Sequence, residues 1–122
     1  MTVTGWGKES NDAKLTLNNF EIYRASTDTL RKARVPYYDD NECETLGFEN
    51  IDTKKQICSG GQDNVDSCSG DSGGPLVYRR SPDSSWYQVG VVSFGTVQCG
   101  VGIPGIYTRI TSYIDWLKQN VV

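Results

Sequence analysis

Residues 66–75 read Asp66-Ser67-Cys68-Ser69-Gly70-Asp71-Ser72-Gly73-Gly74-Pro75. Glycines on both sides of Ser72 permit a sharp turn whose backbone amides face one point. Such amides stabilise negative charge that develops beside a serine oxygen. The stretch therefore predicts a serine nucleophile on a glycine-rich turn, six residues after an acid, Asp66, that is suited to line a specificity pocket. A glycine-rich hairpin with an incidental serine is the alternative, and it suits an isolated Gly-x-Ser-x-Gly better than the longer string Gly70–Pro75.

The composition conflicts with this prediction in one respect, because the 122 residues include no histidine. A serine hydroxyl is a poor nucleophile near neutral pH unless an adjacent base takes its proton. The chain thus has the nucleophile half of a catalytic apparatus without the base half, and we expect it to be close to inactive alone.

The length and composition indicate one small globular domain, with 37% hydrophobic and 22% charged residues. The net charge is −3 and no basic stripe is visible, so nucleic acid is not an expected partner. No apolar run approaches membrane-spanning length, so no membrane association is expected. The N-terminal residues lack the basic and apolar regions of a secretory signal and look like the interior of a domain.

The four cysteines stand at positions 43, 58, 68 and 99. Their spacing alone leaves three possible pairings open. It does not match a paired Cys-x-x-Cys zinc site, and no histidine is present to act as a ligand. We therefore expect two disulfides formed in an oxidising compartment, rather than free thiols, and neither a metal nor a cofactor.

Short alternating apolar patterns predict a mostly β structure. The expected strands are Thr2–Thr4, Leu30–Tyr37, Gln56–Cys58, Pro75–Arg79, Trp86–Ser93 and Gly105–Thr108. The polar turn between Arg79 and Trp86 predicts a hairpin. The expected helices are Asp39–Leu46, capped by Asp39 or Asp40, and Ser112–Val121, capped by Thr111 or Ser112. The polar stretch Lys8–Thr29 is expected to be a long surface loop, although Leu15–Leu17 and Phe20–Tyr23 alternate enough to be extended.

Four motifs together resemble the C-terminal half of a trypsin/chymotrypsin-type serine protease. Along the chain they are the mid-domain marker Val3–Gly7, the nucleophile signature Gly70–Pro75, the substrate-pairing strand Ser93–Gly95 and the closing strand Pro104–Thr108. This is the order in which the family has them. The resemblance implies an all-β fold: a six-stranded antiparallel Greek-key barrel with a C-terminal α-helix. Residues 1–122 would form the second barrel of the peptidase domain, without the N-terminal barrel that holds the histidine and aspartate of the triad.

The resemblance also implies a role for each matching residue. Ser72 matches the acylating nucleophile, and the backbone N–H groups of Gly70 and Ser72 match the oxyanion hole. Asp66 matches the acid at the floor of the pocket for a Lys or Arg side chain, where Ser67 adds a hydroxyl. The other substrate-binding positions are the pocket walls and the strand edge that pairs with an extended substrate: Gly95, Gly105, Ser93 and Phe94.

Asp71 matches the acid that pairs with the N-terminal ammonium freed by zymogen cleavage. The implied disulfides are Cys43–Cys58 and Cys68–Cys99. The function implied is that of a secreted, trypsin-like serine endopeptidase that cleaves proteins and peptides after Lys or Arg once the missing barrel is present. Protein protease inhibitors are further expected partners. The alternatives are a non-catalytic homologue that binds basic peptide segments, which the intact Ser72 argues against, and a purely structural β-domain.

Overall fold

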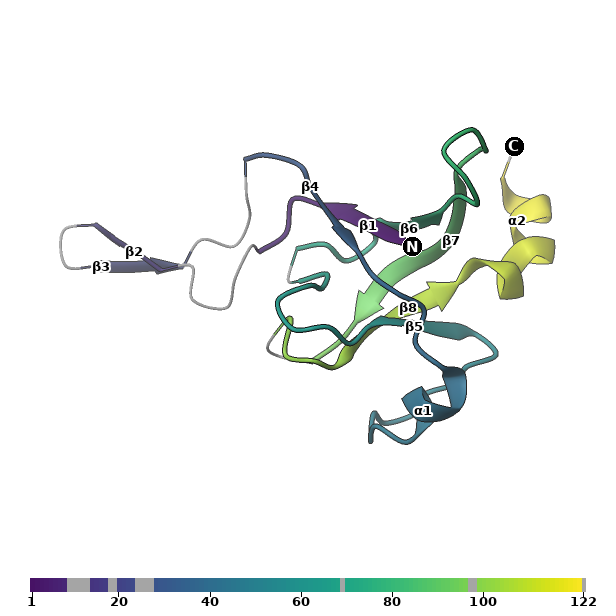
Figure 1. Cartoon of the computed structure of the whole chain (residues 1–122), viewed down its shortest axis with the longest axis horizontal. Coiled ribbons are helices and arrows are strands. Elements are labelled where there is room, and N and C mark those ends of the chain that lie inside the picture. The colour runs from purple at the N-terminus through teal and green to yellow at the C-terminus, as the bar shows by residue number, and fades with distance from the viewer. Residues whose placement is uncertain (9–13, 18–19, 24–27, 69, 97–98, 122) are drawn as a thin grey trace.

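The computed structural model describes residues 1–8, 14–17, 20–23, 28–68, 70–96 and 99–121, with backbone alone at 14–17 and 20–23. Six strands form one antiparallel sheet in the order β4-β1-β6-β7-β8-β5 (Figure 1). Their bounds are β1 Thr2–Gly5, β4 Arg31–Arg34, β5 Gln56–Gly60, β6 Pro75–Tyr78, β7 Tyr87–Phe94 and β8 Pro104–Arg109. The strands β6, β7 and β8 follow one another both in the chain and in the sheet. The last of them, β8, pairs with β5, which precedes all three in the chain, so the connectivity is a Greek key.

The two edges of this sheet meet where the chain leaves β4. Tyr37 pairs with Ser59 of β5 in an isolated antiparallel bridge. The N–H of Tyr38 donates to the carbonyl of Cys58 at 3.0 Å, and the N–H of Gly60 donates to the carbonyl of Pro36 at 2.8 Å. These bonds connect β4 to β5, so the sheet closes into the expected six-stranded barrel.

The interior of the barrel is filled by one apolar cluster. Its buried members come from five strands and the segment after β4: Val3, Val35, Ile57, Leu76, Val92 and Tyr107. Gly90 of β7 lies against this cluster, where a Cβ would come within 3.1 Å of Leu76 and Tyr107. A glycine is therefore required there for the strands to pack this closely.

Both disulfides join the pairs that the resemblance implied. Cys43–Cys58 fastens the helix α1 (Asp40–Glu44) to β5, and Cys68–Cys99 fastens the glycine-rich turn to the chain before β8. The side chain of Asp39 caps α1 by accepting hydrogen bonds from the N–H groups of Asn41 and Glu42. The predicted α1 was too long at its C-terminal end, because its last turn closes at Thr45.

The C-terminal helix differs from the prediction in its start. A 3-10 helix, η1 (Ile110–Tyr113), precedes the α-helix α2 (Ile114–Asn120), and neither has a side-chain cap. The cap predicted at Thr111 or Ser112 is wrong because Ser112 donates its hydroxyl hydrogen bond to the carbonyl of Lys54 instead. No helix in the described ranges is both long and apolar enough to cross a membrane.

The polar stretch after β1 contains a second, two-stranded sheet outside the barrel (Figure 1). Its strands, β2 (Lys14–Leu17) and β3 (Phe20–Tyr23), pair in antiparallel register from Lys14 opposite Tyr23 to Leu17 opposite Phe20. The alternating segments were therefore strands, and the alternative reading of this stretch as partly extended is confirmed for them. The remaining positions of Lys8–Thr29 that lie at 9–13, 18–19 and 24–27 fall outside the described residues.

Candidate active site

The glycine-rich turn presents Ser72 at an exposed position just before β6. The N–H of Asp71 donates to the carbonyl of Cys68 at 2.9 Å, and the N–H of Gly74 donates to the carbonyl of Asp71 at 2.8 Å. Gly70 and Gly73 have positive φ angles of 96° and 82°, which side chains rarely tolerate. The glycines therefore let the chain fold tightly on both sides of the serine.

The turn is anchored to β7 through the backbone on either side of Gly73. The N–H of Gly73 donates to the carbonyl of Val92 at 2.9 Å, and the N–H of Val92 donates to the carbonyl of Gly74 at 2.9 Å. In the described part of the chain, the N–H groups of Gly70 and Ser72 have no acceptor. Two donors beside the serine are thus unused, as an oxyanion site requires.

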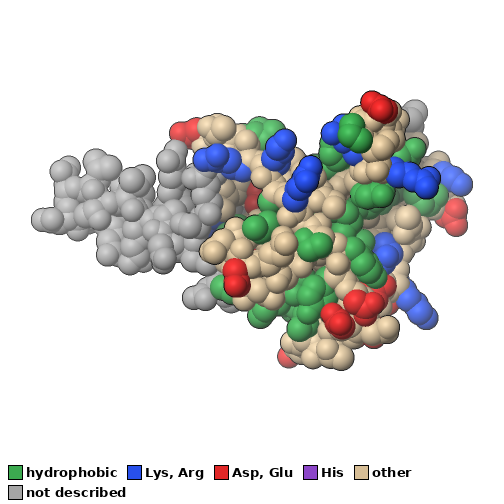
Figure 2. All heavy atoms as spheres, viewed as in Figure 1, with side chains coloured by type: hydrophobic (Ala, Val, Ile, Leu, Met, Phe, Trp, Pro, Cys, Tyr) green, Lys and Arg blue, Asp and Glu red, His purple; other side chains and the backbone are tan. Residues whose placement is uncertain are grey.

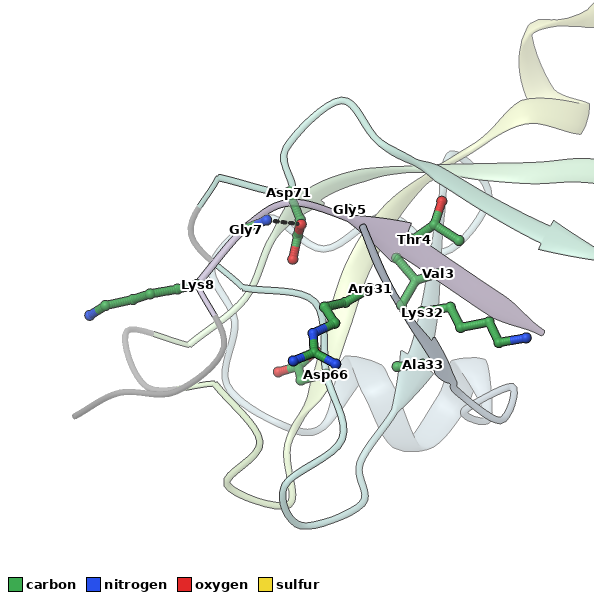
Figure 3. A pocket seen from close by; sticks show the side chains of 10 residues that line it. All are labelled: Val3, Thr4, Gly5, Gly7, Lys8, Arg31, Lys32, Ala33, Asp66 and Asp71. Atoms are coloured by element: carbon green, nitrogen blue, oxygen red, sulfur yellow. Dashed lines mark hydrogen bonds between the residues drawn. The ribbon is translucent and has the colours of Figure 1, made fainter. Parts of the chain in front are cut away.

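The carboxylate of Asp71 holds the turn against the end of β1. Its Oδ1 accepts a hydrogen bond from the N–H of Gly7 at 2.8 Å (Figure 3). Its Oδ2 accepts one from the N–H of Cys68 at 2.9 Å. A Cβ on Gly5 would come within 1.8 Å of Oδ1, and one on Gly7 within 2.5 Å. The absence of a side chain at Gly5 and at Gly7 therefore makes room for the Asp71 carboxylate. The sequence did not indicate this role for the two glycines.

Replacing Gly5 with alanine is expected to lower the free energy of unfolding by about 3 kcal/mol, because the new methyl group expels Asp71 from its hydrogen bonds. Thermal denaturation followed by circular dichroism measures the effect. Gly95→Ala is the matched control, since among the described residues a Cβ there meets the Cα of Gly105 alone, at 3.8 Å. Equal melting temperatures for the two variants would contradict the role given to Gly5.

A cavity of about 150 Å³ opens beside Ser72. Seven of the predicted site residues line it: Asp66, Ser67, Ser72, Ser93, Phe94, Gly95 and Gly105. They come from the turn, the end of β7 and the start of β8. The Cys68–Cys99 disulfide also borders the cavity and ties the turn to its opposite wall. The structure thus brings together residues up to 39 positions apart in the sequence, as the distance from Asp66 to Gly105 shows.

Asp66 has one satisfied and one unsatisfied carboxylate oxygen. Its Oδ2 accepts a hydrogen bond from the N–H of Gly100 at 3.2 Å, while its buried Oδ1 has no hydrogen-bond partner among the described residues. Burial raises the pKa of Asp66 above its ordinary value of 3.8. The hydrogen bonds from the N–H groups of Gly100 and Ser67 lower this pKa in part, and the charge of Asp71 raises it. Within the described ranges, Asp66 forms no ion pair and its Oδ1 accepts no hydrogen bond.

The wall beside Asp66 depends on the absence of a side chain at Gly105. A Cβ there would lie 3.2 Å from Oδ1 of Asp66 and 3.4 Å from Oγ of Ser67. The hydroxyl of Tyr107 donates to Oγ of Ser67 at 3.2 Å, and burial raises the pKa of Tyr107 to about 12. Tyr107 is therefore a neutral donor that orients the Ser67 hydroxyl at any physiological pH.

Replacing Asp66 with asparagine is expected to raise the melting temperature more at pH 7 than at pH 3. Because the folded-state pKa lies above the unfolded value, the folded protein binds more protons in the window between the two pKa values. Its stability therefore falls as the pH rises through that window, and the asparagine variant escapes this loss. Circular dichroism melts of both proteins at the two pH values test the expectation.

The exposed Asp83 provides the control for that experiment, since Asp83→Asn removes one carboxylate without touching the cavity. This variant should have the same melting temperature as the wild-type protein at both pH values. The same melting-temperature difference at pH 3 and pH 7 for Asp66→Asn would show that burial of the Asp66 charge does not affect stability.

The rim of the cavity contains an aromatic contact that the sequence analysis missed. Phe48, in the loop after α1, packs edge-on against Phe94, with ring centroids 6.0 Å apart and an interplanar angle of 75°. Between Val92 and Phe94 the register of β7 against β8 shifts, which leaves Ser93 as an extra residue in the strand. Such a bulge redirects side chains, and no short-range sequence signal links Phe48 to it.

A second cavity, of about 300 Å³, shares Asp66 with the first and is also lined by Asp71 (Figure 3). Gly5, Gly7 and the basic residues Arg31 and Lys32 of β4 contribute to its lining. It opens next to the carboxylate of Asp71, whose partners in this structure are the two backbone N–H groups given above.

The structure is an all-β Greek-key barrel that exposes a serine on a glycine-rich turn, beside a cavity bordered by a disulfide. This is the architecture of one half of a chymotrypsin-type protease. A family model described as trypsin matches residues 1–117. The chain therefore belongs to the trypsin-type family of serine proteases.

Individual relatives agree with this assignment. The chain is 54% identical to CLIP domain-containing serine protease B4 of Anopheles gambiae over 96% of its residues, covering 29% of that protein. It is 41% identical to CLIP domain-containing serine protease HP8 of Bombyx mori over 99% of its residues, covering 30% of that protein. It is 38% identical to Melanization protease 1 of Drosophila melanogaster over 99% of its residues, covering 28% of that protein. The chain thus spans about 30% of the length of these curated relatives.

Proposed function

We propose that the full-length protein containing this chain is a serine endopeptidase that cleaves peptide bonds after Lys or Arg. The observation that supports this specificity most directly is the buried, unpaired Oδ1 of Asp66 in the cavity that Ser72 lines. A buried carboxylate oxygen without a hydrogen-bond partner is costly, and a Lys or Arg head group would supply both a donor and a positive charge. Gly95 and Gly105 leave the cavity open for a long side chain.

In this proposal, Oγ of Ser72 attacks the carbonyl carbon of the bond that follows the bound Lys or Arg. The oxygen of that carbonyl gains negative charge and accepts hydrogen bonds from the N–H groups of Gly70 and Ser72. The proton of the serine hydroxyl passes to a histidine in the N-terminal barrel, which later returns it to the leaving amine. Ser93 and Phe94, exposed at the end of β7, pair with the extended substrate backbone.

Asp71 has a regulatory role in the same proposal. The ammonium group of a newly cleaved N-terminus enters the 300 Å³ cavity and pairs with the Asp71 carboxylate. Because Asp71 already bonds to Cys68 at the start of the turn, this pairing orders the backbone around Ser72.

The chain by itself is proposed to be inactive, since its 122 residues include no histidine to serve as the base. The N-terminal barrel is therefore its first partner. Two disulfides agree with an extracellular location, where protein substrates and protein protease inhibitors would be met.

Labelling with a fluorophosphonate probe tests this proposal. The probe should modify Ser72 when the chain is mixed with an N-terminal half that carries the histidine, and should not modify the chain alone. Mass spectrometry of the labelled peptide identifies the modified residue. Labelling in neither sample would favour the second candidate, a non-catalytic homologue that binds basic peptide segments, which the absence of histidine from the chain keeps open.

A further inference from the structure

A groove of about 480 Å³ lies between the end of β4 and the turn that joins β6 to β7. Its lining shares no residue with the cavity beside Ser72. Figure 2 shows Lys and Arg side chains over β4 and around the β6–β7 turn, with apolar side chains between them and an acidic side chain at the tip of that turn. A ligand in this groove would therefore not compete with a substrate side chain at Asp66.

Three arginines line the groove, Arg34 from β4 and Arg79 and Arg80 from the turn, and none of the lining residues is acidic. In the part of the chain that the structure describes, none of the three forms an ion pair. This basic cluster contrasts with the net charge of −3 for the whole chain. Arginine is the side chain that binds carboxylates in a bidentate manner, so the cluster suits a ligand with several carboxylates.

Arg79 is held in place before any ligand binds. Its guanidinium lies 4.5 Å from the ring centroid of Trp86, and its Nη1 donates to the carbonyl of Pro82 at 3.1 Å. The turn is also fixed, because Ser81 and Ser84 exchange hydrogen bonds of 2.9 Å through the Ser84 hydroxyl. Since a guanidinium has five N–H donors, Arg79 retains donors for a ligand at little cost in conformational entropy.

The groove also has apolar and aromatic walls. Trp86 and Tyr78 contribute to the lining and are 52% and 46% exposed, and Met1, Val77 and Pro82 add aliphatic surface. A sulfated polysaccharide would use the charges but not these walls. An extended peptide uses both, because its side chains alternate and can place a carboxylate beside an apolar group.

We propose that this groove is a binding site, separate from the cavity beside Ser72, for an acidic and partly apolar segment of a protein partner. The arginines bind the carboxylates of the segment, while Trp86 and Tyr78 contact its apolar side chains. Binding in this groove does not depend on catalysis. The proposal therefore remains testable even if the full-length protein has no peptidase activity.

The test measures binding of a fluorescein-labelled decapeptide of alternating Glu and Phe to the full-length protein by fluorescence anisotropy. The double variant Arg79→Glu, Arg80→Glu should weaken binding at least about tenfold, because two charge-assisted contacts become repulsive. The double variant Lys54→Glu, Lys55→Glu changes the net charge equally outside the groove and should stay within about twofold of the wild type. Thermal denaturation confirms that each variant is folded, independently of any enzymatic assay.

Four further outcomes decide whether the groove binds an acidic peptide segment. A weaker affinity of the Trp86→Ala variant for the peptide would support the contact between Trp86 and the apolar side chains of the ligand. Equal weakening in the two double variants would overturn the proposal, since only net charge would then matter. Binding to the isolated chain but not to the full-length protein would also overturn it: the N–H of Val35 donates to the carbonyl of Met1, so residues before Met1 could then fill the groove as a continuation of β1. Tight binding of heparin that is lost in Arg79→Glu, Arg80→Glu, with no peptide binding, would assign the groove to a polysaccharide instead.

Discussion

Replacing Ser72 with alanine in the full-length protein is expected to lower kcat for an arginyl peptide substrate by about a millionfold. The variant loses the oxygen that forms the acyl-enzyme, and in Ser-His-Asp proteases the loss of the nucleophile alone has about that effect. Steady-state kinetics with a chromogenic arginyl substrate measures the loss. Binding of benzamidine, which reports on the cavity rather than on the nucleophile, should change by no more than about threefold.

The exposed Ser85 in the β6–β7 turn supplies a matched control, since Ser85→Ala removes a hydroxyl remote from the cavity. This variant should retain the full rate. A Ser72→Ala protein that kept kcat within tenfold of the wild type would refute acylation at Ser72. The isolated 122-residue chain should resemble the Ser72→Ala variant in rate, because it lacks the base.

Replacing Asp66 with serine in the full-length protein is expected to abolish its preference for Lys and Arg. Under the proposed function, a bound apolar side chain would leave the buried Oδ1 of Asp66 without a partner, which disfavours apolar substrates. Sites built to pair a substrate's polar group discriminate by about 10⁴-fold. The ratio of kcat/KM values for arginyl and leucyl substrates should therefore fall by about that factor.

Asp63 provides the comparison for charge, because Asp63→Ser removes an exposed carboxylate from the same loop, outside the cavity. The Asp63→Ser enzyme should keep its preference for basic residues. An unchanged preference in Asp66→Ser would mean that another group confers the specificity, and the role of Asp66 would have to be abandoned.

Much of the fold was predictable from local patterns. Tyr87–Phe94 alternates and is rich in β-branched residues, so its prediction as Trp86–Ser93 was shifted by only one residue at each end. The hairpin between β6 and β7 followed from the polar turn. An aspartate cap on α1 was predicted at Asp39 or Asp40, because such a side chain accepts backbone hydrogen bonds, and the structure has it at Asp39. These features depend on residues close in sequence, which is why the pattern was sufficient.

Features that depend on distant partners were not predictable in the same way. The start of α2 was wrong because Ser112 bonds to Lys54, 58 residues away. The contact of Phe48 with Phe94 and the groove around Arg79 and Trp86 each join segments that share no local motif. A propensity or a spacing rule contains no information about which segments meet across a closed sheet.

The sequence alone determined the family, through the string around Ser72 and the motifs that surround it, because each motif is contiguous and its residue types are dictated by local geometry. The tertiary structure alone decided that Asp66 has an unpaired oxygen, that Gly5 makes room for Asp71, and that three arginines line one groove whose described lining contains no carboxylate. The reason is physical: burial, steric clearance and charge pairing depend on which atoms approach one another, and the closure of the barrel brings together atoms that the sequence keeps apart.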